Sequence, residues 1–289
     1  MSDDSAAALR AVVLGAGYIG TDLLYKIARS NRLRCVLVVG RRSGTVGLRR
    51  ADSMGLRTST EGISALMADP DAFDVVFDCT DAVANREHWR MLKQHGKRLI
   101  NLTPAISGHM IIPAINGDDA AAHSDVNMIS CGGQAAIPLL AALASVVPSI
   151  DYVEIVTSAA SSSVGMGTRV NLDEYIDATS LAVQVFARAG RVKSMVNLSP
   201  ARPPVVFRVT IFVQAAGIRM GEVEAQLASM AERVRAYCPG YRLKDCSQRA
   251  DGTLALDVEV EGGADYLPVY AGNLDIINAA AIRVAGAMA

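Results

Sequence analysis

One cysteine of the sequence lies where a chain can make a thiol reactive. In VNMISCGGQAAIP, residues 126–138, an apolar run ends at Ser130, Cys131 opens a turn, and a helical stretch follows. The free N–H groups and positive dipole end of a helix stabilise a thiolate, and they can also stabilise an oxyanion on an attacked carbonyl. Gly132 and Gly133 leave space for a substrate. Cys131 is therefore the candidate nucleophile, and the alternative is an ordinary buried cysteine.

A glycine-rich turn near the N-terminus predicts a dinucleotide site. The apolar run 12–14 leads into Gly15, Gly17 and Gly20, spaced G-x-G-x-x-G, and apolar residues at helical spacing follow. The first glycine permits a tight bend, the second lets a pyrophosphate approach the backbone, and the third lets the helix pack on its strand. The helix N-terminus then attracts the phosphate charge. The alternative is a glycine turn without a ligand.

The end of the second predicted strand, residues 35–39, bears on the choice of cofactor. An acidic residue at this place usually binds the ribose 2′-hydroxyl, but this chain has Arg41 and Arg42 after Gly40. Guanidinium groups donate charge-assisted hydrogen bonds to phosphate oxygens. The two arginines therefore favour NADP(H) over NAD(H), and the alternative is a solvated surface turn.

A reactive thiol that faces a nicotinamide implies a particular reaction. An aldehyde adds to the thiolate as a thiohemiacetal, a hydride leaves to the cofactor, and the thioester that remains passes to an acceptor. In this scheme the Cys131 sulfur is bonded to the substrate carbon in both the thiohemiacetal and the thioester.

The composition narrows the class of protein. The 289 residues suffice for about two domains, and a net charge of −1 argues against a dedicated nucleic-acid binder. Five cysteines without a CxxC pair and four histidines without metal spacing predict a reducing compartment and no metal site. The N-terminus lacks the pattern of a secretory signal and no long apolar run occurs, so we expect a cytoplasmic protein without a membrane segment.

Alternating strands and helices predict a parallel sheet in the first half of the chain. We expect strands at 12–14, 35–39, 75–79, 98–102 and 126–130, with helices at 62–70 and 85–96. The second half predicts strands at 152–160, 205–214 and 253–262 and helices at 173–190 and 221–240. Alternation in the last two strands is typical of an antiparallel sheet with one solvent-exposed face, which we expect to pair two subunits. Pro138 is expected in the first turn of the helix after Cys131.

The sequence resembles the acylating acetaldehyde dehydrogenases, CoA-dependent enzymes of meta-cleavage and related catabolic pathways. The resemblance covers nearly the whole chain. It rests on the segments GAGYIGTDL, VVFDCT, LTPA, VNMISCGGQAAIP, GTRVNLDEY, SPARPP, PGYRLK and YLPVYAGNLDI. The combination of CGGQA, GTR-x-N and AGNLDI is specific for this family.

The resemblance implies a fold and a division into domains. The fold class is α/β, with a Rossmann dinucleotide-binding domain and an α+β dimerisation and catalytic domain like that of glyceraldehyde-phosphate and semialdehyde dehydrogenases. We expect the first domain at residues 1–131, completed by a C-terminal helix at 273–289, and the second domain at 132–272.

The resemblance also assigns roles to residues. It implies that Cys131 carries the acyl thioester. The positions that it implies for the cofactor are Gly15, Ala16, Gly17, Tyr18, Ile19 and Gly20, the loop Ser163, Val164, Gly165, Met166, Gly167, Thr168, Arg169, Val170 and Asn171, and finally Asn273. The loop 163–171 is small, polar and glycine-rich, as expected of a segment that closes over a cofactor. For Asn273 the competing explanation is an N-cap of the last helix.

The sequence departs from the family pattern in four features. Arg41 and Arg42 replace an acidic residue, Asn101 replaces an aspartate, and the stretch from Asp245 to Leu254 is shorter. Val209 stands where the family has a carboxylate that is proposed to assist the cysteine. Because a valine accepts no proton, either another group does so or the helix end alone maintains the thiolate.

The sequence therefore predicts an acylating dehydrogenase that interconverts acetaldehyde or a related short-chain aldehyde plus CoA with acyl-CoA, using NAD(P). Expected partners are a second copy of the chain and an aldolase of the 4-hydroxy-2-oxovalerate type. Three alternatives remain open at this point. They are an NADPH-dependent reductase of a specialised acyl thioester on CoA or a carrier protein, an acyl-phosphate reductase, and a binding homologue without turnover. The acyl-phosphate enzymes usually have a catalytic histidine after the cysteine, whereas the last histidine here is His123.

Overall fold

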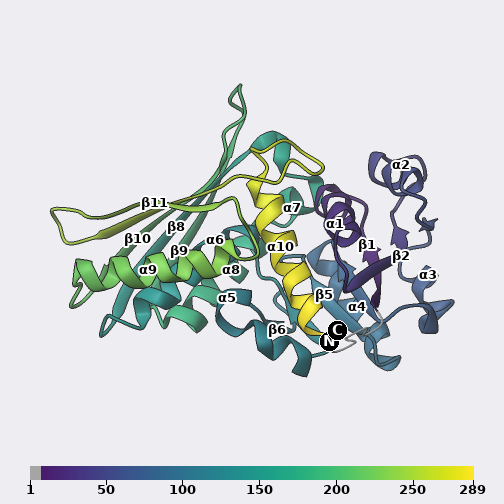
Figure 1. Ribbon diagram of the computed structural model, residues 1–289, viewed down its shortest axis with the longest axis horizontal. Helices are drawn as coiled ribbons and strands as arrows, with labels where there is room; N and C mark the ends of the chain where they lie inside the picture. The colour runs from purple at the N-terminus through teal and green to yellow at the C-terminus, as the bar shows by residue number, and fades with distance from the viewer. Residues whose placement is uncertain (1–7) are drawn as a thin grey trace, which may run out of the picture.

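A computed structural model describes residues 8–289 of the chain. Two β-sheets form the framework, and the yellow C-terminal helix lies between the two halves of the molecule (Figure 1). The described chain contains no helix that is both long enough and apolar enough to cross a membrane.

The first sheet has seven strands, and all of its pairings are parallel. Its strands in spatial order are β3 (Thr58–Ser59), β2 (Leu33–Val39), β1 (Leu9–Leu14), β4 (Val75–Asp78), β5 (Arg98–Asn101), β7 (Asp125–Asn127) and β6 (His109–Met110). The helical segments among them are α1 (Tyr18–Ala28), α2 (Val46–Ser53), α3 (Ser64–Met67), η1 (Pro70–Ala72), α4 (Ala82–Gln94), α5 (Pro113–Asn116) and η2 (Gly117–Ala122). The parallel sheet predicted from alternating strands and helices is confirmed.

The strand before the candidate nucleophile ends earlier than predicted. It stops at Asn127 instead of Ser130, and Ile129 then adopts a positive φ of 66°. A β-branched residue rarely takes this conformation. The Asn127 side chain holds it there by accepting a 2.6 Å hydrogen bond from the Ile129 N–H. The backbone therefore turns sharply before it enters the next helix.

The second sheet has five strands. Their spatial order is β11 (Tyr241–Gln248), β12 (Leu254–Val260), β10 (Phe207–Ala215), β8 (Ile150–Ala160) and β9 (Arg191–Ser199). Only β8 and β9 pair in parallel, so the predicted mostly antiparallel sheet is confirmed. The sequence pattern predicted the three inner strands and missed β9 and β11. Both missed strands are sheet edges, where polar and half-exposed residues weaken the apolar alternation.

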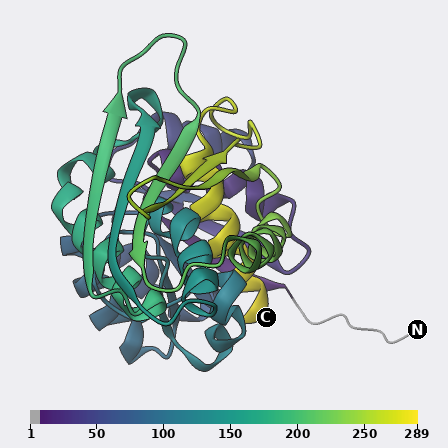
Figure 2. The same ribbon diagram turned by 90° about the vertical axis from the view of Figure 1, so that its left-hand side faces the viewer.

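Helices cover one face of this second sheet. They are α6 (Cys131–Ala144), α8 (Leu172–Ala187), α9 (Met220–Arg235) and part of α10 (Gly272–Ala287), whereas the short η3 (Ser161–Ser163) and α7 (Met166–Val170) follow the end of β8. Along β10 the residues Phe207, Val209, Ile211 and Val213 are fully buried, and the residues between them face away from this core. Figure 2 shows the long strands in front of the helices. The opposite face of the sheet, which carries no helices in the described chain, is the one expected to pair subunits.

The C-terminal helix α10 connects the two halves. It packs against α1 of the first half and α6 of the second. Lys26 of α1 lies 2.5 Å from Asp275 of α10 and 2.9 Å from Asp265 of the preceding loop, and Asn278 donates to Asp22 at 2.8 Å. Lys26 is 9% exposed, so this ion cluster is buried. It joins segments more than 200 residues apart in the chain.

A buried carboxylate in β7 should cost the folded protein stability at neutral pH. Burial raises the pKa of Asp125 to about 6, and its Oδ1 has no hydrogen-bond partner in the described chain. The unfolded carboxylic acid titrates near pH ~4. Stability therefore falls as the pH rises from about 4 to about 6 and stays lower above that.

We expect Asp125→Asn to remove this cost. The free energy of unfolding at pH 7 should rise by about 1–3 kcal/mol, and the gain should vanish near pH ~4. Denaturant titrations at both pH values measure it. Asp119→Asn, at a side chain that is 57% exposed in the same region, is the matched control and should change little. An equal gain at both pH values would contradict the electrostatic explanation.

Candidate active site

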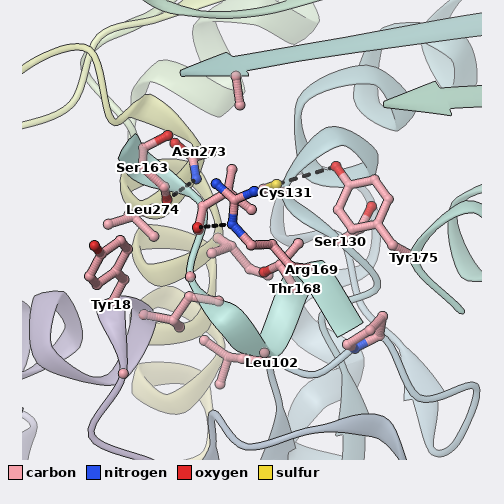
Figure 3. Close-up of a pocket in the computed structure, with 18 of the residues that line it drawn as sticks. Tyr18, Leu102, Ser130, Cys131, Ser163, Thr168, Arg169, Tyr175, Asn273 and Leu274 are labelled. Atoms are coloured by element: carbon pink, nitrogen blue, oxygen red, sulfur yellow. Dashed lines mark hydrogen bonds between the residues drawn. The ribbon is translucent and has the colours of Figure 1, made fainter. Parts of the chain in front are cut away.

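A cavity of about 500 Å³ lies where loops of both sheets meet. Its first-half walls come from the start of α1 and from the loops that follow β4, β5 and β7, which are carboxyl ends of parallel strands. This is the edge at which open α/β sheets bind ligands. Its second-half walls come from β8, β9, η3, α7 and α8, and α10 contributes Asn273 and Leu274. Figure 3 shows Tyr18, Cys131, Arg169, Tyr175 and Asn273 around this space.

Cys131 lines the cavity as the first residue of α6. Ser130 is the N-cap, and its hydroxyl accepts a hydrogen bond from the Gly133 N–H at 2.9 Å. The helix therefore begins at Cys131 itself, not after a turn. As a consequence Pro138 lies inside the helix and not in its first turn as predicted.

The helix end does not by itself maintain a thiolate. Burial raises the pKa of the Cys131 thiol above its usual range, although hydrogen bonds from Tyr175 and the Gly132 N–H lower it. The thiol is therefore mainly protonated at neutral pH in the free protein. This differs from the sequence-based expectation because desolvation of the charged form outweighs the helix end.

Two of the first three N–H groups of α6, those of Gly132 and Gly133, already donate to side-chain hydroxyls. The Gly132 N–H donates to the Tyr175 hydroxyl at 2.8 Å, and the Gly133 N–H donates to Ser130. Side-chain hydroxyls thus satisfy donors that a helix start leaves open.

Tyr175 is a site residue that the sequence reasoning missed. It lies in the first turns of α8, and its hydroxyl oxygen is 3.2 Å from Cys131 Sγ (Figure 3). One turn later, Thr179 bonds Ser130 at 2.7 Å, so one face of α8 holds the start of α6. The signal was present in the segment GTRVNLDEY, whose last residue is Tyr175, but no spacing rule connects it with Cys131.

The glycine turn has the geometry that a pyrophosphate requires. Gly15 has φ of 112°, and a Cβ on Gly20 would lie 1.9 Å from the Gly15 carbonyl oxygen. A Cβ on Gly17 would meet no atom within 4 Å. Gly17, Tyr18 and Ile19 line the cavity, whereas Gly15, Ala16 and Gly20 shape the turn behind it.

The segment 163–171 lies along the cavity and contains the short helix α7. Arg169 donates to the carbonyl oxygens of Val164 and Ser161 at 3.0 and 2.7 Å, and to the Ser161 hydroxyl at 2.9 Å. Its guanidinium therefore holds its own segment. Ser163, Val164, Gly165, Met166, Gly167, Thr168 and Arg169 line the cavity, whereas Val170 and Asn171 do not.

Asn273 is not the N-cap of α10, because the helix begins at Gly272 and its N-cap is Ala271. The Asn273 side chain donates to the Ser163 carbonyl oxygen at 3.0 Å and so ties α10 to the segment 163–171. Its Oδ1 is buried and has no partner in the described chain. Asn273 lines the cavity, so this oxygen can accept a hydrogen bond from a bound ligand.

Arg41 and Arg42 lie outside the cavity wall, at the exposed end of β2. Arg41 forms an ion pair with Asp81, which also caps α4 by accepting the Ala84 N–H at 2.9 Å. A 2′-phosphate at this place would share Arg41 with a carboxylate.

Val209 and Asn101, two departures from the family pattern, occupy defined positions. Val209 is fully buried in β10 and pairs in register with Thr157, which lines the cavity. Asn101 accepts the Thr103 N–H at 2.8 Å and donates to the Ala105 carbonyl oxygen at 3.3 Å. Its amide therefore shapes the LTPA loop on the cavity wall.

Comparison with known proteins points to one family. Residues 131–268 match the model of the prokaryotic acetaldehyde dehydrogenase dimerisation domain. The chain is 44% identical over 278 residues to an acetaldehyde dehydrogenase of Pectobacterium atrosepticum, with 96% of this chain and 94% of the relative covered. It is also 44% identical over 282 residues to an acetaldehyde dehydrogenase of Streptomyces griseus, with 98% and 91% covered.

Among solved structures, an aspartate semialdehyde dehydrogenase II from Vibrio cholerae has a TM-score of 0.69 at 11% identity and covers 98% of both chains. That likeness shows the fold, which is the predicted α/β dehydrogenase architecture. The dehydrogenase relatives imply a nicotinamide cofactor. With more than two-fifths of its residues identical to these relatives along almost its whole length, the chain belongs to the acetaldehyde dehydrogenase family.

Proposed function

We propose that this protein is an acylating aldehyde dehydrogenase that interconverts a short-chain aldehyde, such as acetaldehyde, plus CoA with the acyl-CoA. The observation that carries the proposal is that the Cys131 thiol and the glycine turn line one cavity. A nucleophile and a nucleotide site on the same cavity allow a covalently held aldehyde to lose a hydride.

The residues fit a nicotinamide dinucleotide. The open space at Gly17 and the N-terminus of α1 suit the pyrophosphate. The unpartnered Oδ1 of Asn273 could accept a hydrogen bond from the N–H of the nicotinamide carboxamide. The segment 163–169 would hold the nicotinamide half of the cofactor. When bound, the nicotinamide supplies the hydride acceptor.

The cavity favours an uncharged aldehyde. In the described chain, Arg169 is its only Lys, Arg or His residue, and that guanidinium already donates to its own segment. A substrate carboxylate or phosphate would therefore find no free cation. Leu102, Ile129, Val196 and Leu198 provide an apolar surface for a short alkyl chain. An acyl phosphate is disfavoured because its phosphate would also find no free cation there.

The chain's own groups account for the covalent steps. Cys131 loses its proton, its sulfur attacks the aldehyde carbonyl, and loss of a hydride leaves a thioester on Cys131. The start of α6 fixes the sulfur through the Ser130 cap, and the segment 163–169 covers the cavity against water. The thiol of CoA, or of a carrier-protein pantetheine, then takes the acyl group, and the Cys131 thiol is restored.

The assembly proposed here is a homodimer formed through the helix-free face of the second sheet, because the family model for this region is a dimerisation domain. An aldolase partner of the 4-hydroxy-2-oxovalerate type remains part of the proposal. The division into residues 1–131 with 273–289 and residues 132–272 accords with the two sheets and with α10 packing against α1.

Steady-state turnover tests the proposed function. The protein should form NAD(P)H from acetaldehyde only when CoA is present, with acyl-CoA as the product. It should run in reverse from acetyl-CoA and NAD(P)H. Dependence on inorganic phosphate instead of CoA would favour the acyl-phosphate reductase. Cofactor binding without turnover over a series of aldehydes and thioesters would favour a binding homologue.

The arginines after β2 should set a preference for NADP(H). Replacing Arg41 and Arg42 together with serine should lower kcat/KM for NADP(H) by about 10- to 100-fold, because charged hydrogen bonds to the 2′-phosphate are lost. The value for NAD(H) should change little. Arg249→Ser, in the remote hairpin after β11, is a control. A parallel loss with both cofactors would contradict a role in recognising the 2′-phosphate.

A further inference from the structure

The groups that can exchange a proton near Cys131 are few. Within residues 8–289, the cavity wall contains no Asp, Glu, His or Lys. Val209, beside Thr157 on the neighbouring strand, supplies none either. Apart from thiols and Arg169, the ionisable side chains of the wall are Tyr18 and Tyr175. Only Tyr175 forms a hydrogen bond with the sulfur.

The hydrogen bonds around Tyr175 determine the direction of its proton. The Gly132 N–H donates to the hydroxyl oxygen at 2.8 Å, so that oxygen is already an acceptor. The Cys131 sulfur is 3.2 Å from the same oxygen. A thiolate can only accept a hydrogen bond, so in the bond between Tyr175 and an ionised Cys131 the Tyr175 O–H is the donor.

Burial suits Tyr175 to this role. The residue is 5% exposed, and its pKa is raised well above the usual value because burial disfavours the phenolate. The hydroxyl therefore keeps its proton at neutral pH. A group that stays protonated is a hydrogen-bond donor and not a general base.

We propose that the Tyr175 hydroxyl is a catalytic residue that donates a hydrogen bond to the Cys131 thiolate and thereby makes this half-buried thiol easier to ionise. This inference rests on the proposed function and identifies a group that stabilises the thiolate where Val209 leaves no carboxylate to accept the proton. The Cys131 proton leaves to water, and the Tyr175 proton stays on its oxygen throughout. A charge-assisted hydrogen bond offsets part of the cost of burying the thiolate.

The test is the pH profile of Cys131 alkylation by iodoacetamide, followed by mass spectrometry of the Cys131 peptide. Tyr175→Phe should move the midpoint of the profile upward by about one pH unit. Tyr241→Phe is the matched control, because Tyr241 is a fully buried tyrosine whose hydroxyl donates at 2.8 Å to the Ala135 carbonyl oxygen of the same helix. Its midpoint should equal that of the unaltered protein.

A second variant protects the test if Tyr175→Phe does not fold. A Cβ on Gly132 would lie 2.3 Å from Thr157 Oγ1 and 2.6 Å from the Tyr175 hydroxyl oxygen, so Gly132→Ala should displace both hydroxyls and raise the midpoint as well. An unchanged midpoint in a folded Tyr175→Phe protein overturns the inference. Equal shifts in Tyr175→Phe and Tyr241→Phe overturn it too, since they would report a general disturbance of α6.

The alkylation readout is separate from turnover. It needs neither cofactor nor CoA, so it measures the bond between Tyr175 and Cys131 whether or not the proposed reaction is found. If the unaltered protein has the proposed activity, Tyr175→Phe should also lower kcat with little change in KM for the cofactor. It should shift the alkaline rise of the rate by the same amount as the alkylation midpoint.

Discussion

Replacement of Cys131 by serine should lower turnover by at least about a thousandfold, because it removes the group on which both covalent intermediates form. A serine hydroxyl at the start of α6 is far harder to ionise than a thiol, and among residues 8–289 the wall of the cavity offers no carboxylate or imidazole to activate it. Formation of NAD(P)H with acetaldehyde and CoA measures the loss. Titration of NAD(P)H fluorescence should show that the variant still binds cofactor, since the glycine turn is unaltered.

The chain provides a control for this result. Cys246→Ser changes a half-buried cysteine in the edge strand β11, which lies outside the cavity, and should keep full activity. Cys79 is the other thiol on the cavity wall, and burial raises its pKa well above the usual value. If activity depended on Cys79 while Cys131→Ser remained active, the assignment of the nucleophile would be wrong.

Lys26→Met should produce the largest loss of stability, about 3–5 kcal/mol, because it leaves buried carboxylates without their cation. The ammonium group contacts Asp275 and Asp265, and it lies 3.7 Å from Asp22. These carboxylates raise the pKa of Lys26, so its contribution is present below pH ~10 and is lost only at higher pH. Denaturant unfolding at pH 7 measures the change.

The pH dependence identifies the cause of that loss. Hydrogen bonds from Arg29 and Lys26 lower the pKa of Asp265 to about 2, so its stabilising contribution is present above pH ~4 and is lost as the pH falls toward 2. The difference between Lys26→Met and the unaltered protein should therefore narrow over this range. Lys193→Met removes an ion pair of a lysine side chain that is 56% exposed and should cost at most about 1 kcal/mol. Equal losses in both variants would refute the buried cluster as the source.

Local sequence patterns determined the buried strands of both sheets and the glycine turn after β1. Buried parallel strands such as β1 and β4 are short continuous apolar runs, and the glycine spacing after β1 is needed for a tight turn whatever follows. The inner strands of the second sheet alternate because one of their faces is covered by helices. The edge strands β9 and β11 gave no such signal, because a strand with one neighbour keeps more of its residues in water.

Sequence alone also selected Cys131, since a thiol between a strand and a helix requires only local geometry. It did not determine the chemical state of that thiol. The burial of the thiol depends on what packs over the start of the helix. Here the hydroxyl of Tyr175, 44 residues later in the chain, forms hydrogen bonds with both the Cys131 sulfur and the Gly132 N–H. The hydrogen bond from Asn273 to the Ser163 carbonyl oxygen and the pairing of Arg41 with Asp81 are likewise contacts between distant segments. Spacing along the chain determines which residues can lie together locally. Tertiary packing determines how far each group is desolvated and which hydrogen-bond partners it has. Desolvation and hydrogen bonding in turn determine how the groups of the site ionise.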